Sequence, residues 1–153
     1  MLVKDYELNF TFEISDEFNE ISKDKYKVFG VDDDTLHYFL YLDENNEEYP
    51  LALIKGKECA NIEDYEKTIQ AEVDQFKKEI PSAVVSDIFT IEPEDGRRVE
   101  RVSIDYQDGG FMTVVYFTYV GGHVVSASTS ILEDADDYEA GLYKIMQSIK
   151  EME

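Results

Sequence analysis

The chain has 153 residues and a formal net charge of −21, from 35 acidic and 14 basic residues. This charge repels phosphate backbones and anionic lipid surfaces, so nucleic acids and acidic membranes are not expected as partners. Hydrophobic residues make up 43% of the chain and aromatic residues 13%, which is too much for a disordered acidic segment. The composition therefore predicts a single folded domain over residues 1–153.

The first third of the chain has the patterns of β-strands. Apolar and polar residues alternate over residues 8–14, as expected for a strand with one buried face. Further strands are predicted at residues 26–31, 35–42 and 48–55, and the acidic runs between them have the composition of turns.

A helix is predicted next, at residues 61–80. Its apolar residues recur at steps of three and four, which places them on one stripe: Ile62, Tyr65, Ile69, Val73, Phe76 and Ile80. Asn61 is a suitable N-cap, and Pro81 cannot continue a helix. Local residues therefore set both ends of this helix.

Four more strands are predicted at residues 83–91, 99–106, 111–120 and 123–132. Glycine-containing turns separate them at residues 93–96, 108–110 and 121–122, which requires antiparallel pairing. The apolar pattern slips by one residue between Val99 and Val102, which predicts a β-bulge. A second stripe predicts a helix that runs to the C-terminus, with Tyr138, Leu142, Ile145, Ile149 and Met152 on one side.

The order of these elements, four strands, a helix, four strands and a helix, indicates an α+β fold. The strands at residues 35–42 and 111–120 are apolar on both faces, so layers are expected on both sides of the sheet. The sequence therefore predicts a three-layer α/β/α sandwich with a largely antiparallel sheet. Four helical residues are expected to face the sheet: Val73, Phe76, Ile145 and Ile149.

This order and several of its segments resemble the PsbP-like superfamily over nearly the whole chain. The segments are the strand Phe10-Thr-Phe-Glu-Ile-Ser15, the helix that ends before Pro81, the later four-strand meander and the final Met146-Gln-Ser-Ile-Lys150. The superfamily includes DcrB-like bacterial proteins, a Ran-binding nuclear transport factor and the Eag chaperones. The family's proline-glycine-tryptophan turn is replaced by Ser15-Asp-Glu-Phe-Asn19, so the subfamily is left open. The resemblance implies a binding, adaptor or assembly role and no catalysis.

Residues suited to catalysis do not form a recognisable motif. His37 and His123 are the only histidines, and neither has a serine or cysteine at a motif spacing. Cys59 precedes the predicted helix, a position that lowers a thiol pKa, but the neighbouring Glu58 acts in the opposite direction. We therefore expect a protein that is not an enzyme and needs no cofactor.

Acidic clusters raise the question of metal binding. The segment from Asp134 to Asp137 resembles the start of a calcium loop. Glu139, however, stands where that loop needs glycine, and Ile145 where it needs glutamate. The run Asp32-Asp33-Asp34 is explained as a solvated turn. We therefore predict no metal site.

The compartment is inferred from the single cysteine and the chain's apolar segments. Cys59 cannot form an internal disulfide, which fits a reducing compartment. No apolar stretch approaches the roughly 20 residues that span a bilayer, and the first residues lack the apolar core of a signal peptide. The sequence predicts a cytoplasmic protein without membrane insertion, and removal of an export signal is the alternative.

Two groups of residues are candidates for a binding surface. All three arginines lie within five residues and could recognise carboxylates: Arg97, Arg98 and Arg101. Four strand tyrosines combine an apolar ring with a polar tip: Tyr38, Tyr41, Tyr116 and Tyr119. The alternatives are arginines paired with acidic residues on an exposed sheet face, and tyrosines at the boundary between sheet and helices.

The leading functional hypothesis is a non-catalytic binding or adaptor module with a protein or peptide partner, and a homodimer is left open. The second is a metal- or small-ligand-binding domain that uses the acidic loops. The third is a hydrolase with catalytic residues scattered along the chain. We expect sheet aromatics with an arginine at the rim to carry binding, because exposed ion pairs contribute only about 0.2–1 kcal/mol, whereas buried aromatic anchors contribute about 2 kcal/mol or more.

Overall fold

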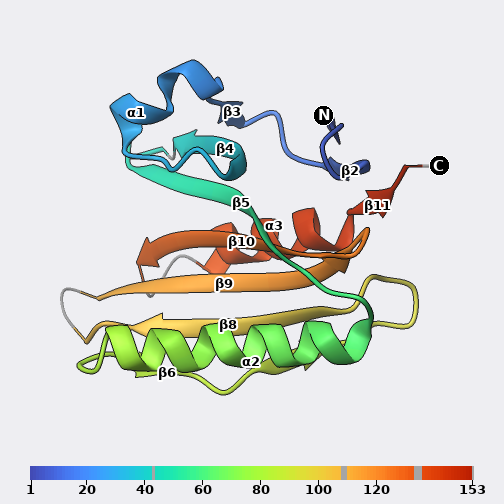
Figure 1. Ribbon diagram of the computed structural model, residues 1–153. Helices are drawn as coiled ribbons and strands as arrows, with labels where there is room; N and C mark the ends of the chain where they lie inside the picture. The colour runs from blue at the N-terminus through green and yellow to red at the C-terminus, as the bar shows by residue number, and fades with distance from the viewer. Residues whose placement is uncertain (43, 108–109, 133–135, 153) are drawn as a thin grey trace.

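The computed structural model describes residues 1–42, 44–107, 110–132 and 136–152 (Figure 1). Its main sheet has eight antiparallel strands in the order β3-β4-β5-β10-β9-β8-β6, with β7 also paired to β8. The strands are β3 (Phe18–Glu20), β4 (Thr35–Leu42), β5 (Glu48–Glu58), β6 (Val84–Val85), β7 (Phe89–Ile91), β8 (Val99–Asp105), β9 (Phe111–Val120) and β10 (His123–Leu132). The predicted α+β class with a large antiparallel sheet is confirmed.

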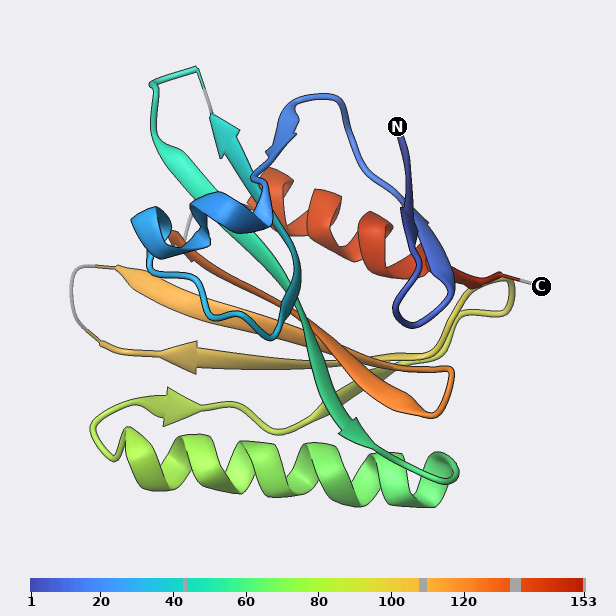
Figure 2. The same ribbon diagram turned by 45° about the horizontal axis from the view of Figure 1, so that its top comes forward.

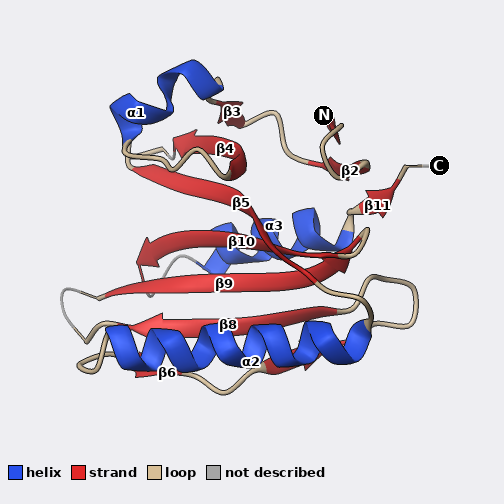
Figure 3. Ribbon diagram, viewed as in Figure 1, coloured by secondary structure: helices blue, strands red, loops and turns tan. Residues whose placement is uncertain are grey.

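Two long helices pack on opposite faces of this sheet, α2 (Ile62–Glu79) and α3 (Asp136–Gln147) (Figures 1 and 3). The alternation of side chains in β9 shows the two faces. Val115 and Phe117 pack in the cluster beneath α2, whereas Val114 and Tyr116 pack in the cluster beneath α3. We refer to these as the α2 face and the α3 face. The predicted three-layer arrangement is confirmed.

The predicted mid-chain helix agrees closely with α2. The Asn61 side chain accepts a hydrogen bond from the backbone N–H of Asp64 at 3.0 Å, as an N-cap does. The stripe packs on the sheet, with Ile69 and Val73 buried and Phe76 half-buried. Ile145 and Ile149 are buried on the other face, so the four residues expected to face the sheet do so.

A second, smaller sheet joins the two ends of the chain (Figure 1). It consists of β1 (Leu2–Asp5), β2 (Phe10–Glu13) and β11 (Lys150–Glu151), in the order β1-β2-β11. The prediction of a helix up to Met152 was therefore wrong, because α3 ends at Gln147. The Ser148 hydroxyl accepts a hydrogen bond from the backbone N–H of Glu13 at 2.8 Å, and the chain then continues as a strand.

The strand predicted at residues 26–31 is also wrong, because this segment is helical. A 3-10 turn, η1 (Lys23–Lys25), leads into the short helix α1 (Tyr26–Phe29). Gly30 ends it in the left-handed conformation, at φ +69°, which glycine adopts without strain. The helix lies on the same side of the sheet as α2 (Figure 2).

The predicted bulge between Val99 and Val102 does not occur where β8 pairs with β9. The register is continuous from Glu100 to Asp105. The apolar pattern of the sequence slips here because a charged residue, Glu100, occupies a buried position of the strand. A one-residue shift occurs instead in the strand predicted at residues 83–91. This shift divides the predicted strand into β6 and β7, so the structure has two strands where the sequence predicts one.

The buried stripe of α2 generates a stability prediction. Ile69 is 2% exposed, so Ile69→Ala should lower the free energy of unfolding by about 2–5 kcal/mol through lost burial and a cavity. Phe76→Ala should cost less, because that ring is half-buried. Urea denaturation measures both. Ile62→Ala is the control, since Ile62 is 42% exposed on the same helix; equal losses for Ile69 and Ile62 would contradict the packing.

Candidate binding surfaces

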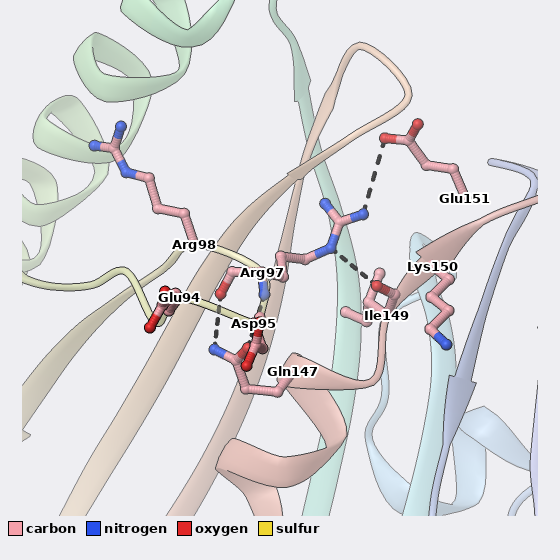
Figure 4. Close-up of a pocket in the computed structure, with 9 residues that line it drawn as sticks. Glu94, Asp95, Arg97, Arg98, Gln147, Ile149, Lys150 and Glu151 are labelled. Atoms are coloured by element: carbon pink, nitrogen blue, oxygen red, sulfur yellow. Dashed lines mark hydrogen bonds and ion pairs between the residues drawn. The ribbon is translucent and has the colours of Figure 1, made fainter.

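Arg97 does not present a free guanidinium fork. It lies just before β8 in a cleft of about 610 Å³ beside the end of α3 (Figure 4). Its Nε donates to the carbonyl of Ile149 at 3.0 Å and its Nη1 to the carbonyl of Tyr119 at 2.6 Å. Burial lowers the pKa of Arg97, although Glu151 opposes that shift. The side chain therefore ties the C-terminal segment to the sheet.

Gln147 completes this connection through the backbone of Arg97. The backbone N–H of Arg97 donates to Gln147 Oε1 at 2.8 Å, and Gln147 Nε2 donates to the Arg97 carbonyl at 2.7 Å (Figure 4). The amide lies directly against Gly96, where a Cβ atom would overlap both Gln147 and the ring of Pro93. Only glycine leaves room for this paired contact.

Arg98 joins a buried network that holds α2 on the sheet. Its Nε donates to Glu100 at 2.9 Å and its Nη2 to Glu66 of α2 at 2.8 Å. The Glu100 side chain is 1% exposed and also accepts a hydrogen bond from the hydroxyl of Tyr65. Burial, followed by this bond, raises the pKa of Tyr65, so it remains a neutral donor. A buried carboxylate with both partners in place is stable, whereas removal of one partner is costly.

Arg101 and Tyr116 are two candidates whose side chains share one partner. Arg101 Nε donates to Glu139 Oε1 of α3 at 2.5 Å, and the Tyr116 hydroxyl donates to the same oxygen at 3.2 Å. Burial and the Glu139 charge raise the pKa of Tyr116 to about 12. Beside them is an apolar cleft of about 280 Å³, here called the Tyr116 cleft, lined by Ile91, Tyr116, Glu139, Ala140 and Tyr143.

Tyr41 and Tyr119 contribute mainly to packing. The Tyr41 ring lies 5.6 Å from Tyr138 and 5.2 Å from Phe18, within an aromatic group on the α3 face. Tyr119 contacts the ring of Tyr65 at 6.1 Å on the α2 face, and its hydroxyl reaches the Cys59 carbonyl at 3.4 Å.

Tyr38 lies in a groove that the sequence did not reveal. Its ring is 6.3 Å from Tyr26 and 6.1 Å from Phe29 of α1. Burial and the charge of Glu48 raise its pKa. The groove has a volume of about 260 Å³, and we call it the α1 groove; its lining includes Phe29, Asp32, Tyr38, Pro50, Ala52, Ser128 and Ser130.

The floor of the α1 groove is an uncovered part of the α2 face. Tyr38 is paired opposite Ala52, and Ala52 opposite Ser128, so the three side chains share a face. Ser128 in turn pairs with Val115, which packs beneath α2. The groove and α2 therefore lie on one face of the sheet, as the position of α1 shows (Figure 2).

The side chains of both histidines contact other residues of the chain. The two ring nitrogens of His37 lie 2.8 Å from Asp5 and 3.0 Å from Glu20. His123 contacts the carbonyl of Gly121 at 3.3 Å. In the part of the chain that the structure describes, these ring contacts include no serine or cysteine side chain.

Cys59 is buried, and its environment does not activate it. Burial and then the charge of Asp64 raise its pKa, which disfavours the reactive thiolate. Within the described ranges, no three histidine, cysteine or acidic residues form a group that could hold a metal ion. Asp134 and residue 135 of the calcium-loop-like segment lie outside these ranges, as do residues 108 and 109 of the predicted glycine turn.

The seven predicted site residues therefore do not share one surface. Tyr38 and Tyr119 lie on the α2 face, whereas Tyr41 and Tyr116 lie on the α3 face. The predicted site residues do not include Phe29, because the sequence pattern predicts a strand at residues 26–31, where the structure has α1. The spacing of Tyr26 and Phe29 followed by Gly30 is the signal that could have indicated a helical turn there.

Comparisons with known proteins identify the fold. No family model matches the chain, and no curated protein matches it either. Among solved structures, cyanobacterial PsbP from Synechocystis sp. PCC 6803 has a TM-score of 0.64 at 12% identity, with 99% of this chain and 91% of that chain covered. The Ran-binding protein Mog1p of Saccharomyces cerevisiae has a TM-score of 0.63 at 10% identity, with 100% and 95% covered.

LpqN of Mycobacterium tuberculosis, described as involved in cell envelope biogenesis, has a TM-score of 0.56 at 13% identity and covers 94% of this chain and 83% of its own. The chain has the PsbP-like fold. This confirms the resemblance seen in the sequence. Among the helices of the described residues, none has the length and apolar character that a membrane crossing requires.

The contact between Gly96 and Gln147 generates a prediction. Gly96→Ala should displace the Gln147 amide from Arg97 and lower the free energy of unfolding by about 1–3 kcal/mol. Gln147→Ala removes the same bonds, so the double variant should be less destabilised than the sum of the singles. Denaturant unfolding of all three provides the measurement.

Gly141→Ala is the matched control for this experiment. Gly141 lies within α3, and a Cβ there would meet nothing within 4 Å. That substitution should stabilise the protein by about 0.5–1 kcal/mol. Additive losses for Gly96→Ala and Gln147→Ala would show that the two residues do not act through one contact.

Proposed function

We propose that this chain is a non-catalytic module that binds a protein or peptide segment in the α1 groove. The observation that carries the proposal is the combination of an uncovered sheet floor with an aromatic wall. The floor consists of small side chains, such as Ala52 and Ser128, which let a partner approach the strands closely. The wall consists of Tyr38 and Phe29, and the Phe29 side chain is 42% exposed.

Aromatic side chains at such a position suit the role of binding anchors. Tyrosine and phenylalanine bury a large apolar area and lose little conformational entropy, so a few of them dominate the energy of many interfaces. In contrast, the arginines of the original hypothesis make internal contacts with carbonyls and carboxylates. We therefore assign anchoring to Tyr38 and Phe29.

The charge around the groove indicates the chemistry of the partner. Asp32 lines the groove, and the exposed Asp33 and Asp34 follow it directly. Glu48 is near enough to raise the pKa of Tyr38. A segment with apolar residues flanked by lysine or arginine would complement this surface. Charge of this kind acts mainly on the rate of encounter and on specificity.

The comparisons support a binding role only in general terms. Mog1p is a Ran-binding protein, so at least one protein of this fold binds another protein. At 10% identity this similarity extends to the fold and not to the partner. The second hypothesis, ligand binding by the acidic loops, has no cluster of suitable residues within the described ranges to favour it. The cytoplasmic location stays a prediction.

The proposal can be tested with a displayed library of random dodecapeptides. Selected peptides should contain apolar and basic residues, and their synthetic forms should bind the purified protein in biolayer interferometry. Phe29→Ser and Tyr38→Ser should each weaken binding at least about tenfold, the loss expected for an aromatic anchor. Tyr6→Ser is the matched control, because Tyr6 is 75% exposed and does not line the groove. Unchanged affinity in both groove variants would contradict the proposal.

Ionic strength separates the contribution of the acidic residues to binding from that of the aromatic side chains. Higher salt should slow association with the acidic protein and leave dissociation nearly unchanged, because apolar anchors are not screened. If dissociation accelerates strongly with salt, and substitution of Asp32, Asp33 and Asp34 by asparagine abolishes binding, then the acidic residues are the anchors and the aromatic wall is not.

A further inference from the structure

A second surface lies at the opposite edge of the sheet. β6 and β7 form this edge, and among the described residues no strand pairs with their outer side. Val84 is 53% exposed and Phe89 is 63% exposed there. An open strand edge with exposed apolar residues is a template for pairing with another chain.

The exposed Phe89 and the Tyr116 cleft share one face. Phe89 is paired opposite Arg101, and Arg101 opposite Tyr116, so these three side chains point to the α3 face in one row. Ile91 belongs to the same strand as Phe89 and lines the cleft, together with Ala140 of α3. The apolar area is therefore continuous from the strand edge into the cleft.

The charge near this edge disfavours a second copy of the chain. Asp87, Glu92 and Glu94 are exposed beside β7, and Arg101 is paired with Glu139. Two copies, each with a formal charge of −21, would bring these acidic residues together. A basic partner would instead be attracted.

We propose that the outer edge of β7 is a second docking surface, which takes an extended basic peptide segment by strand addition and places one apolar side chain in the Tyr116 cleft. In this mode, backbone hydrogen bonds supply affinity and the cleft supplies specificity. The α1 groove is on the other face, so the module can hold two partners at once. This surface does not depend on the groove being a binding site.

The test uses a fluorescein-labelled ten-residue peptide of alternating lysine and valine, followed by fluorescence anisotropy. The peptide should bind, and its complex should slow amide hydrogen exchange at residues 89–91. Phe89→Ser and Ala140→Leu, which fills the cleft, should each weaken binding at least about fivefold. Tyr6→Ser is the matched control and should change nothing, because Tyr6 is 75% exposed and lines neither the Tyr116 cleft nor the α1 groove.

A second peptide of identical charge, with alternate backbone nitrogens methylated, separates strand addition from general attraction to an acidic protein. Methylation removes the N–H donors along one edge of the peptide, so binding should fall at least about tenfold. Equal binding of the two peptides would overturn the proposal. So would the absence of binding, protection of the α1 groove instead of β7, or a dimer in sedimentation that is lost in Phe89→Ser.

Discussion

The two long helices lie over different strands, and both candidate surfaces follow from this offset. Seven strand positions at about 4.8 Å spacing make a sheet about 29 Å wide, whereas a helix with its side chains is only about 10–12 Å across. α2 packs on β6, β8, β9 and β10, and leaves β4 and β5 to the short α1. On the opposite face, α3 and the small sheet share one hydrophobic cluster with β4, β5, β9 and β10, and leave the outer edge of β6 and β7 unpaired among the described residues.

The three arginines make contacts within the fold. Each guanidinium has five N–H donors in a planar fork, which suits several acceptors at once. Arg97 uses this fork on two carbonyls, Arg98 on two carboxylates and Arg101 on Glu139. All three arginines of the chain thus connect helices or the C-terminal strand to the sheet. The excess of acidic over basic residues, 35 against 14, is what favours basic partners at the two open surfaces.

Much of the fold could be predicted because the apolar period reports burial. This period predicts α2 and the long strands correctly. A buried position, however, does not determine whether the backbone there is helical. Ile149 continues the stripe of α3 although the helix has already ended. The spacing between two residues of one strand also predicts whether their side chains share a face. Tyr38 and Tyr41 are three residues apart, as are Tyr116 and Tyr119, and an odd spacing in a strand places side chains on opposite faces.

A shared fold explains the layers of this protein but not its surfaces. Cores tolerate extensive substitution when volume and patterning are kept, so 10–13% identity is compatible with the same sandwich in PsbP, Mog1p and LpqN. Side chains outside the core are under no such constraint, so function has to be argued from the site. In this chain, an exposed aromatic residue lies at each of the two candidate surfaces, Phe29 of α1 at the α1 groove and Phe89 of β7 at the strand edge. Both side chains leave part of their apolar area in contact with water in the free protein, 42% of Phe29 and 63% of Phe89, and partner binding would bury that area.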